Sequence, residues 1–489
     1  MNIKAADEAR VLASVPKGLL IDGVWRDSSD GSTLDVSDPA TGQVIATIAS
    51  ATASDGMAAL DAADRAQKAW AKTAPRYRAE ILRKAFDRVI EMADDFAILM
   101  SIEMGKPFAE AKGEVMYGAE FLRWFSEEAA RVAGRFATAP DGKMRLMVQK
   151  RPVGLSLFIT PWNFPLAMAT RKIAPAIAAG CTMVLKPSQV SPIDAILFTE
   201  LIDEVGFPKG VFNLVTGDGV VIGRQLSLHP DVDVVSFTGS TRAGREISRD
   251  AAETIKVVHL ELGGKAPVVV FADADLAAAA EAIAIAGYFN AGQDCTAATR
   301  VIVQDSVYDE FVALLTEQAK AVAIGAPADE DVFLGPVNNS NQLARVSDLL
   351  SRVPSHAQVM AGGSALDRPG FFFPATVVAG LRQDDELIQK EIFGPVITVQ
   401  KFSDEAQAVS MANGVEYGLA SSVWTANHGT AMRMAKAFDF GCVWINTHIP
   451  LVAEMPHGGF KRSGYGKDLS AYGFEDYTRI KHVMTNLNG

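Results

Sequence analysis

Short apolar runs alternate with longer helical patterns over most of the chain after residue 154, and this alternation constrains the fold more than any other feature. A strand buried on both faces reads as a continuous apolar run, and parallel strands need a crossover connection between them. We therefore predict an α/β fold with two parallel-sheet units. The first is expected from strands at 155–159, 182–185, 211–215, 232–237 and 268–271, and the second from strands at 300–304, 358–361, 396–400 and 421–425.

The two ends of the chain carry different patterns. Residues 18–25 and 38–43 are typical of short strands and turns, whereas apolar residues recur every three or four positions between about 53 and 125, as in amphipathic helices. The segment 476–484 alternates in polarity and predicts an edge strand. Because an unpaired edge strand promotes aggregation, we expect it to pair.

Composition narrows the class of protein. The 489 residues correspond to about three domain-sized units. With 46 Lys and Arg against 58 Asp and Glu, the formal net charge of −12 argues against nucleic acid as a partner. The sequence has no run of about 18 uncharged apolar residues and no long apolar core in its first 30 residues, so a membrane partner is not expected. We expect a cytoplasmic protein.

Several chemistry-bearing motifs fail when they are tested. The dinucleotide fingerprint Gly-x-Gly-x-x-Gly is approached only by Gly217, Gly219 and Gly223, with one residue too many, and no Gly-Lys pair precedes Ser or Thr as a phosphate loop requires. His259-Leu-Glu261 matches half of a zinc deaminase motif, but the Pro-Cys-x-x-Cys half is absent. The sequence also lacks His-Glu-x-x-His, so no metal is expected.

Three cysteines, Cys181, Cys295 and Cys442, are too few for a disulfide framework or a four-cysteine metal site. Cys181 and Cys442 lie in apolar surroundings and are expected to be structural. Cys295 follows an Ala-rich helical pattern and the small, polar stretch Asn290-Ala-Gly-Gln-Asp, which favours an accessible, irregular segment. Cys295 is therefore the candidate nucleophile.

A thiol that attacks a carbonyl needs an oxyanion donor, and a second step needs a base to activate water. Asn163 follows an apolar run and lies between two prolines in Thr160-Pro-Trp-Asn-Phe-Pro, which would fix the direction of its amide. Glu261 follows the apolar run 256–260 and precedes two glycines that leave space around it. Taken alone, each has an ordinary alternative, a proline-rich turn for Asn163 and a solvated loop carboxylate for Glu261.

Seven motifs follow one another along the chain and must be read together. They are Phe-Ile-Thr-Pro-Trp-Asn-Phe-Pro (158–165), Val-Leu-Lys-Pro-Ser (184–188), Phe-Thr-Gly-Ser-Thr (237–241), Glu-Leu-Gly-Gly (261–264), Gly-Gln-Asp-Cys (292–295), Glu-Ile-Phe-Gly-Pro (391–395) and Pro-His-Gly-Gly-Phe-Lys (456–461). With these motifs in this order, the chain resembles the NAD(P)-dependent aldehyde dehydrogenase superfamily over essentially its whole length. The resemblance implies oxidation of a small aldehyde to its acid, and an α/β fold of two Rossmann-type parallel-sheet domains with a β ribbon for oligomerisation.

The resemblance assigns catalytic roles to four residues. Cys295 matches the thiolate that forms a thiohemiacetal and, after hydride transfer, a thioester. The Asn163 side chain and the Cys295 backbone N–H match the oxyanion hole. Glu261 matches the base that activates water, and Lys172 resembles a lysine near a proton path.

The resemblance also implies a cofactor site. Lys186 and Glu391 match residues that bind the nicotinamide ribose, and Phe393 matches one beside the ring. Gly239 and Ser240 are expected to open a helix whose N-terminus faces the pyrophosphate. Further pocket positions are Thr160, Trp162, Ser188, Gly217 and Gly223. The position after Lys-Pro-Ser is Gln189, which neither binds both ribose hydroxyls as a carboxylate would nor repels a 2'-phosphate, so NAD and NADP both stay open.

The substrate is harder to infer, because the two halves of the chain resemble different enzymes. The segment around Arg171 is similar to succinate-semialdehyde dehydrogenases, where Arg171 would hold the distal carboxylate. Those enzymes usually add an Arg and a Ser at the positions occupied here by Phe289 and Leu451. The second half resembles 4-aminobutyraldehyde dehydrogenases, and there Phe289, Asp294 and Glu454 would favour an ammonium group.

We therefore expect a four-carbon substrate, with a 4-aminobutyraldehyde-like aminoaldehyde as the leading candidate and succinate semialdehyde as the alternative. Asp294 has its own alternative, a hydrogen bond to nearby backbone that turns it away from the tunnel. Because acylating relatives generally lack a base at the Glu261 position, hydrolysis of the thioester is expected. A catalytically silent relative is disfavoured by the complete set of Cys295, Asn163, Glu261, Lys186 and Glu391.

The resemblance also divides the chain. We expect a cofactor-binding domain from residues 1–128 and 149–260 and a catalytic domain from 261–465. An oligomerisation segment is expected from 129–148 and 466–489. A homodimer or homotetramer is expected, joined in part by the C-terminal strand.

Overall fold

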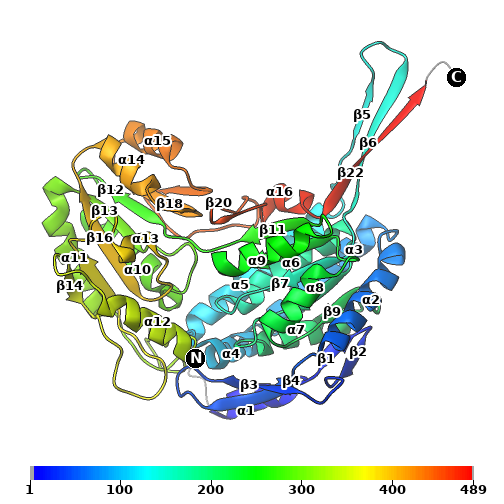
Figure 1. Cartoon of the computed structure of the whole chain (residues 1–489), viewed down its shortest axis with the longest axis horizontal. Coiled ribbons are helices and arrows are strands. Elements are labelled where there is room, and N and C mark those ends of the chain that lie inside the picture. The colour runs from blue at the N-terminus through cyan, green and yellow to red at the C-terminus, as the bar shows by residue number, and fades with distance from the viewer. Residues whose placement is uncertain (1–4, 487–489) are drawn as a thin grey trace.

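A computed structural model describes residues 5–486, and its largest sheet has eight strands in the order β2-β1-β9-β8-β7-β10-β11-β21 (Figure 1). The central five strands β9 to β11 run parallel, and the edge strands pair antiparallel. Strands β7 to β10 are buried along their whole length, as their uninterrupted apolar runs predict. The bounds are β1 Leu19–Ile21, β2 Val24–Arg26, β7 Ser156–Ile159, β8 Met183–Lys186, β9 Phe212–Leu214, β10 Val234–Thr238, β11 Val257–Glu261 and β21 Gly464–Tyr465.

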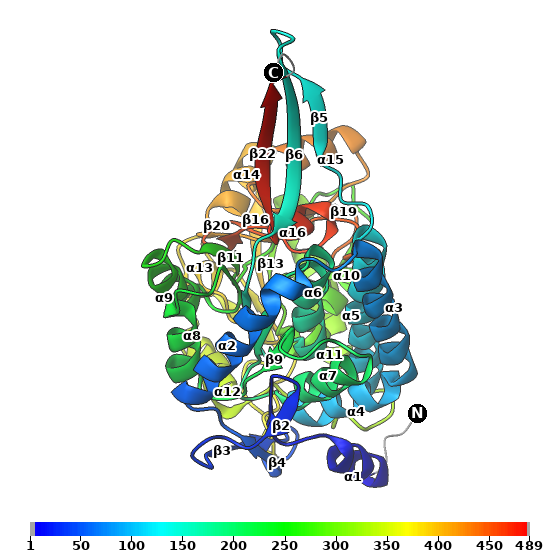
Figure 2. The same cartoon turned by 90° about the vertical axis from the view of Figure 1, so that its right-hand side faces the viewer.

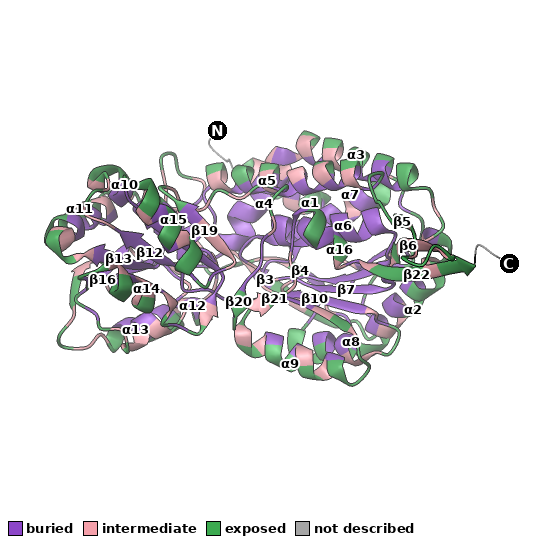
Figure 3. Ribbon diagram, turned by 90° about the horizontal axis from the view of Figure 1, so that it is seen from above, coloured by how far each residue is buried: buried purple, intermediate pink, exposed green. Residues whose placement is uncertain are grey.

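Helices cover both faces of this sheet (Figure 3). One face packs against α3 to α7 through a large apolar core, and the other packs against α2, α8 and α9 through a separate core. Amphipathic periodicity predicted the long helices between 53 and 125, and α2, α3, α4 and α5 occupy that segment. The helices are α1 Ala5–Ser14, α2 Ala53–Trp70, α3 Pro75–Glu91, α4 Ala93–Met104, α5 Phe108–Glu128, α6 Pro165–Ala179, α7 Ile193–Glu204, a π-helical turn Gly219–Gly223, α8 Arg224–Leu228 and α9 Thr241–Ala252.

A second sheet has the order β14-β15-β16-β13-β12-β18-β19 and is parallel except at β14. It confirms the predicted second α/β unit. Its strands are β12 Pro267–Val270, β13 Arg300–Gln304, β14 Gln358–Ala361, β15 Thr376–Ala379, β16 Val396–Phe402, β18 Ala420–Trp424 and β19 Cys442–Ile445. Its helices are α10 Leu276–Tyr288, α11 Tyr308–Ala321, α12 Ser340–Ser351, α13 Glu386–Gln389, α14 Glu405–Asn413 and α15 His428–Ala437, with short 3-10 turns at Phe289–Gly292 and Asp305–Val307.

The apolar runs located the strands with few errors. The run 268–271 forms β12 in the second sheet, not in the first as predicted, because it pairs with β13 and β18. Strands β15 and β19 escaped prediction. β19 has only Trp444 fully buried among its four residues, so its apolar signal is weak. Cys181 is fully buried as predicted, whereas Cys442 in β19 is only half-buried.

A three-stranded ribbon projects from the body of the molecule (Figures 1 and 2). It consists of β5 Arg135–Thr138, β6 Met144–Pro152 and β22 Thr478–Asn486, with β6 in the centre. The predicted C-terminal strand thus pairs with β6 of its own chain over nine residue pairs, and its other edge is unpaired within residues 5–486. The remaining elements are β3 Thr33–Ser37, β4 Val44–Ala49, β17 Tyr417–Gly418, β20 Phe460–Lys461 and α16 Ser470–Glu475.

The proposed domain and oligomerisation boundaries stay predictions, and their terminal residues 1–4 and 487–489 lie outside the described part of the chain. Strand β6 crosses the expected boundary at residue 148, because it continues to Pro152. Strand β21 joins the first sheet although residues 464–465 lie within the expected catalytic segment. Among residues 5–486, no helix combines the length and apolar character that crossing a membrane requires.

Candidate active site

The predicted site residues gather at one edge of the first sheet. Strands β9, β8, β7, β10 and β11 are parallel, so their carboxyl ends lie along the same edge, where α/β proteins bind ligands. The residues at or just beyond these ends are Thr160, Trp162 and Asn163 after β7, Lys186, Ser188 and Gln189 at β8, Gly217 after β9, Gly239 and Ser240 after β10, and Glu261 at the end of β11.

Cys295 reaches this edge on an irregular loop that follows α10. Asn290, Ala291 and Gly292 adopt consecutive left-handed conformations with φ of 53°, 54° and 66°. A side chain at Gly292 would meet the backbone oxygen of Gly394 at 2.1 Å, so only glycine allows this approach. The sequence predicted an irregular segment here, and the structure shows three consecutive residues in the left-handed conformation.

Hydrogen bonds hold the cysteine loop against the Asn163 turn. The Asn290 side chain donates to the backbone oxygen of Asn163 at 2.9 Å. The Asn163 side-chain nitrogen donates to the backbone oxygen of Gln293, also at 2.9 Å. Since a side-chain amide carries two N–H groups, the second one of Asn163 is left for another acceptor. Residues 130 positions apart in the chain are thereby fixed relative to one another.

Two cavities meet at Cys295. The first has a volume of about 330 Å³ and the second about 210 Å³, and both are lined by Cys295 and Met168. The first opens along the sheet edge, and the second is walled by α5, α6, the cysteine loop and the segment 449–457. A thiol at such a junction can contact one molecule from each side.

The first cavity has the features expected of a dinucleotide site. Ser240 caps α9 by accepting a hydrogen bond from the Ala243 backbone N–H, so the positive end of the helix faces the cavity. Five of the predicted cofactor residues line it, together with further polar groups from both sheets. The predicted ones are Trp162, Gly239, Ser240, Glu391 and Phe393, and the others include Thr238, Arg242, Gln342 and Arg345.

The other predicted cofactor residues lie outside this lining. Gln189 faces a separate cavity of about 230 Å³, where Asp35 and Asp218 are its neighbours. Lys186 is buried and donates to the Pro187 backbone oxygen at 2.9 Å. The remaining ones, Thr160, Ser188, Gly217 and Gly223, lie near the ends of β7, β8 and β9.

Burial shifts the pKa of the two residues assigned to the ribose toward neutrality. Desolvation lowers the pKa of Lys186 to about 8, opposed by the nearby charge of Asp218. Desolvation raises the pKa of Glu391 to about 6, although its carboxylate accepts a 2.9 Å hydrogen bond from the Gly264 backbone N–H. Both side chains are therefore close to their titration points at neutral pH.

The second cavity contains three of the four predicted substrate residues. Arg171 and Asp294 line it, and so does Phe289, which stacks on Phe164 with ring centroids 6.2 Å apart. The carboxylate of Asp294 accepts hydrogen bonds of 2.8 Å from both the backbone N–H and the hydroxyl of Thr296. The backbone contact agrees with its alternative role, but Asp294 still lines the cavity and is not turned away from it. Glu454 is exposed and outside the lining of both cavities.

The environment of Cys295 disfavours its thiolate. Desolvation raises the pKa of the thiol well above its usual value, and the negative charges of Asp294 and Glu261 raise it further. Arg171 acts in the opposite direction. These surroundings therefore favour the neutral thiol over the thiolate.

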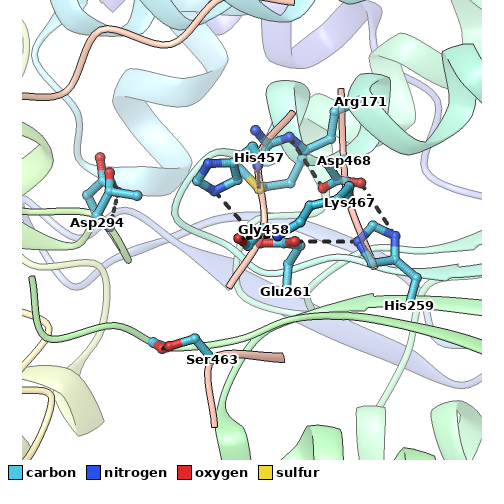
Figure 4. Close-up of polar contacts among 12 residues, drawn as sticks. Arg171, His259, Glu261, Asp294, His457, Gly458, Ser463, Lys467 and Asp468 are labelled. Carbon is cyan, nitrogen blue, oxygen red and sulfur yellow. Dashed lines mark hydrogen bonds and ion pairs between the residues drawn. The ribbon is translucent and has the colours of Figure 1, made fainter. Parts of the chain in front are cut away.

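A buried cluster of charged and imidazole side chains surrounds Glu261 (Figure 4). His259 Nε2 lies 3.4 Å from Glu261 Oε1, and His457 Nε2 lies 3.7 Å from Oε2. Burial raises the pKa of Glu261 and lowers the pKa of His457 to about 3. The imidazole of His457 is thus neutral at physiological pH, and it forms part of the wall of the second cavity.

Asp468 joins this cluster to α6. Its carboxylate lies 3.4 Å from Lys172 Nζ and 3.5 Å from Arg171 Nε. Burial alone would raise the pKa of Asp468, but Lys172, His259 and Arg171 lower it to about 2. Lys172 is fully buried, lines neither cavity and contacts Asp468 and Ser236. It therefore belongs to the buried cluster, and its place on a proton path stays a prediction.

Metal binding at this cluster conflicts with its charge balance. Ligand atoms of His259, Glu261 and Asp468 lie within 4.8 Å of one another. However, Asp468 is already paired with the cationic groups of Arg171 and Lys172. A metal ion would have to displace or face both of these charges, so the geometry favours a protein-internal network.

Sequence reasoning missed His259, His457 and Asp468 of this cluster, and also Tyr117, which lines the second cavity and accepts a hydrogen bond from Arg171. His259 and Glu261 are two residues apart in β11, and side chains at that spacing lie on the same face of a strand. This signal was present in His259-Leu-Glu261 but was tested only as a zinc motif. His457 and Asp468 are 11 positions apart in the chain and are joined by an isolated antiparallel backbone bridge. No local sequence pattern predicts this pairing.

Comparisons with known proteins agree with this architecture. The aldehyde dehydrogenase family model matches residues 25–483. The chain is 46% identical over 442 residues to succinate-semialdehyde dehydrogenase of Paenarthrobacter nicotinovorans, covering 90% of this chain and 98% of the relative. It is 42% identical over 469 residues to the NADP(+) succinate-semialdehyde dehydrogenase of Escherichia coli strain K12, covering 96% and 97%.

A solved structure gives the same result. Betaine aldehyde dehydrogenase of Staphylococcus aureus in complex with NAD+ superposes with a TM-score of 0.96 and 35% identity, covering 99% of this chain and 98% of that chain. The resemblance carried by the seven motifs and the α/β fold class are confirmed. The chain therefore belongs to the aldehyde dehydrogenase family and is an NAD(P)-dependent oxidoreductase.

Proposed function

We propose that this chain oxidises a dicarboxylic acid semialdehyde, with succinate semialdehyde as the leading candidate, and releases the acid by hydrolysis. The semialdehyde dehydrogenases among its relatives support this substrate better than the aminoaldehyde that the second half of the sequence favours. The observation that carries the proposal is the position of Arg171 in the same cavity as Cys295.

The guanidinium of Arg171 offers donors to a substrate. Its side chain is only 2% exposed, and its Nε faces Asp468. Its terminal nitrogens lie 3.5 Å from the Met168 sulfur and 3.3 Å from the Tyr117 hydroxyl, both weaker acceptors than a carboxylate. A substrate carboxylate at this point would replace weak contacts with charge-assisted hydrogen bonds. Phe289 and Leu451 occupy positions where succinate-semialdehyde dehydrogenases usually carry an Arg and a Ser. Arg171 is therefore the one Lys or Arg side chain among the described residues that line this cavity.

The first half-reaction follows from the junction of the cavities. NAD(P)+ in the first cavity would supply the hydride acceptor, and the residues that fit it are the α9 N-terminus, Glu391 and Phe393. Cys295 would lose its thiol proton to solvent and attack the aldehyde carbon, giving a thiohemiacetal. Transfer of hydride from that carbon to the cofactor would then leave a thioester on the Cys295 sulfur. The free N–H of the Asn163 amide stabilises the developing oxyanion.

The second half-reaction is hydrolysis of the thioester on Cys295. Glu261 lines the cofactor-side cavity next to the cysteine and has a raised pKa, as suits a base that works near neutrality. Its carboxylate takes a proton from water as the water attacks the thioester, and the Cys295 thiolate leaves. His259 contacts Glu261, and Asp468 and Lys172 lie beyond His259, so these residues would offer the proton a route away from the site.

The aminoaldehyde remains the second candidate for one reason. Asp294 and the ring face of Phe289 lie in the substrate cavity, where an ammonium group would find both. The carboxylate of Asp294 is already engaged by Thr296, and the charge of Arg171 opposes a cation in the same cavity.

The test compares kcat/KM for succinate semialdehyde, 4-aminobutyraldehyde, betaine aldehyde and butyraldehyde, each with NAD+ and NADP+. Succinate semialdehyde should give the highest value. In Arg171→Ala, its kcat/KM should fall about 10- to 100-fold, as expected for a lost charged hydrogen bond, while butyraldehyde changes by less than about threefold. The ratio of the two aldehydes cancels any general loss of active enzyme.

Tyr117→Phe is the matched control, because it removes the hydroxyl beside Arg171 but keeps the guanidinium. It should leave the succinate semialdehyde to butyraldehyde ratio within about twofold of the wild-type value. A higher kcat/KM for 4-aminobutyraldehyde, or an equal loss for both aldehydes in Arg171→Ala, would reject the proposed substrate. The same data set decides between NAD+ and NADP+, which the neutral Gln189 leaves open.

A further inference from the structure

Glu261 is contacted by imidazole on each of its two oxygens, but the two contacts differ. His259 Nε2 lies within hydrogen-bond length of Oε1 at 3.4 Å, whereas His457 Nε2 lies 3.7 Å from Oε2. His259 shares strand β11 with Glu261, so the backbone of the central sheet fixes both side chains on one face. One carboxylate oxygen is therefore held, and the other has no contact of hydrogen-bond length in the described chain.

The other ring nitrogen of His259, Nδ1, contacts a buried hydroxyl on the neighbouring strand. His259 Nδ1 lies 3.1 Å from the hydroxyl of Ser236 on β10, and Lys172 Nζ lies 2.9 Å from the same hydroxyl. An ammonium group only donates, so the Ser236 oxygen accepts from Lys172. The hydrogen of the Ser236 hydroxyl has two candidate acceptors, His259 Nδ1 and the buried Tyr477 hydroxyl, and only the contact with His259 has hydrogen-bond geometry. His259 Nδ1 then accepts, which leaves the ring proton on Nε2, facing Glu261.

A competing partner for Nδ1 is Asp468, whose Oδ1 lies 3.6 Å away. That distance exceeds hydrogen-bond length. Lys172 and Arg171 pair with the other oxygen of Asp468, Oδ2, and Oδ1 has no hydrogen-bond partner among the described residues. The hydroxyl of Ser236 is therefore the hydrogen-bond partner of Nδ1. The direction of donation runs from Lys172 through Ser236 and His259 to Glu261.

Packing leaves the His259 ring no freedom. The residue is 1% exposed, and a side chain at Gly466 would meet its Cδ2 at 2.5 Å. Gly458 leaves space for Glu261 in the same way, because a side chain at position 458 would meet Glu261 Oε1 at 2.6 Å. Two glycines of the C-terminal segment thus make the space in which the imidazole and the carboxylate meet.

We propose that His259 is a positioning residue for Glu261, its tautomer fixed by Ser236 and Lys172, and that it holds Oε1 so that Oε2 accepts the proton of the attacking water. The proposal rests on the role of Glu261 as the base in thioester hydrolysis. It predicts a defect in the second half-reaction and not in the first, because His259 is outside the lining of both cavities.

The experiment measures the pre-steady-state burst of reduced cofactor and the steady-state kcat, using whichever of the four aldehydes gives the highest kcat/KM. His259→Leu removes both ring nitrogens and should keep the burst while kcat falls about tenfold. His259→Gln keeps an N–H near the Nε2 position and should lose less than about threefold. His428→Leu, the same change at an exposed histidine on α15, should match the wild-type enzyme.

A pH profile separates positioning from packing. The hydrogen bond from His259 lowers the pKa of Glu261, so His259→Leu should shift the acid limb of kcat to higher pH, and His259→Gln should not. If His259→Leu turns over like the wild-type enzyme, or if His259→Gln is as impaired as His259→Leu, the proposal is wrong. Should His259→Leu fail to fold, Ser236→Ala serves instead. It should retain the burst and lower kcat about threefold, and an unchanged kcat would reject the chain of donors.

Glu261→Gln in the same assay tests the role of Glu261 as the base separately from the role of His259 as its positioning residue. A surviving burst with blocked turnover supports Glu261 as the base, so an unaffected His259→Leu would then overturn only the role of His259. Normal turnover of Glu261→Gln would instead overturn the proposed hydrolytic function itself.

Discussion

The two cavities that meet at Cys295 are built in different ways. The cofactor-side cavity is formed largely by turns at the ends of adjacent parallel strands, each carried by a short local motif. The substrate-side cavity is assembled from α5, α6, the cysteine loop and residues 449–457, which come from three distant parts of the chain. Local motifs therefore indicate the reaction and its cofactor class, whereas the substrate depends on how separate segments face one another.

The largest effect is expected at the residue that both cavities share. Cys295→Ser should lower kcat by at least about 1,000-fold with every aldehyde, because the hydroxyl is a much weaker nucleophile than the thiolate. Binding of NAD(P)H, followed by its fluorescence, should persist. If Cys295→Ser keeps its NAD(P)-dependent oxidation, the cysteine is not the nucleophile. The two cavities would then not mark the place where aldehyde and cofactor react.

On the cofactor side, Asn163→Ala should lower kcat about 100- to 1,000-fold, as for the loss of one oxyanion-hole donor. The loss should be similar for charged and neutral aldehydes, because the oxyanion is common to all of them. Circular dichroism and the thermal midpoint would detect damage from the lost hydrogen bond to Gln293. A loss confined to succinate semialdehyde would instead make Asn163 a substrate ligand.

On the substrate side, Phe289→Arg should raise the ratio of kcat/KM for succinate semialdehyde over butyraldehyde by about tenfold, through a second cation near Arg171. It should lower kcat/KM for 4-aminobutyraldehyde, because it replaces a ring face with a positive charge. Phe289→Leu is the matched control that removes the ring without adding charge. A higher kcat/KM for 4-aminobutyraldehyde in Phe289→Arg would contradict the proposal that the end of the substrate remote from the aldehyde lies near Arg171 and Phe289.

The smallest effect is expected at Asp294, which borders the cysteine. Its charge raises the pKa of the Cys295 thiol, so Asp294→Asn should lower that pKa and increase the rate of alkylation by iodoacetamide at pH 8 about threefold. Glu454→Gln removes an exposed acid and should leave the rate unchanged. Equal rates for Asp294→Asn and the wild-type enzyme would show that Thr296 shields the thiol from this carboxylate.

The sequence by itself determined the fold class and most of the reaction chemistry. Parallel strands show as apolar runs because both of their faces are buried, so the pattern alone predicted an α/β fold. Local patterns also marked Cys295, Asn163 and Glu261 as candidates, but their catalytic roles and the helix N-terminus at Ser240 were implied by the resemblance to aldehyde dehydrogenases. The structure brings these residues to one edge of the first sheet.

Only the tertiary structure decided which charges surround Glu261 and the substrate. The side chains of Lys172, Ser236, His259 and Asp468 come from α6, β10, β11 and the segment after β21. They touch because a helix, two strands and that segment pack together. Their contacts span up to 296 positions in the chain. Electrostatic interactions depend on distance in space, so a sequence that names each charged group cannot say which of them are neighbours.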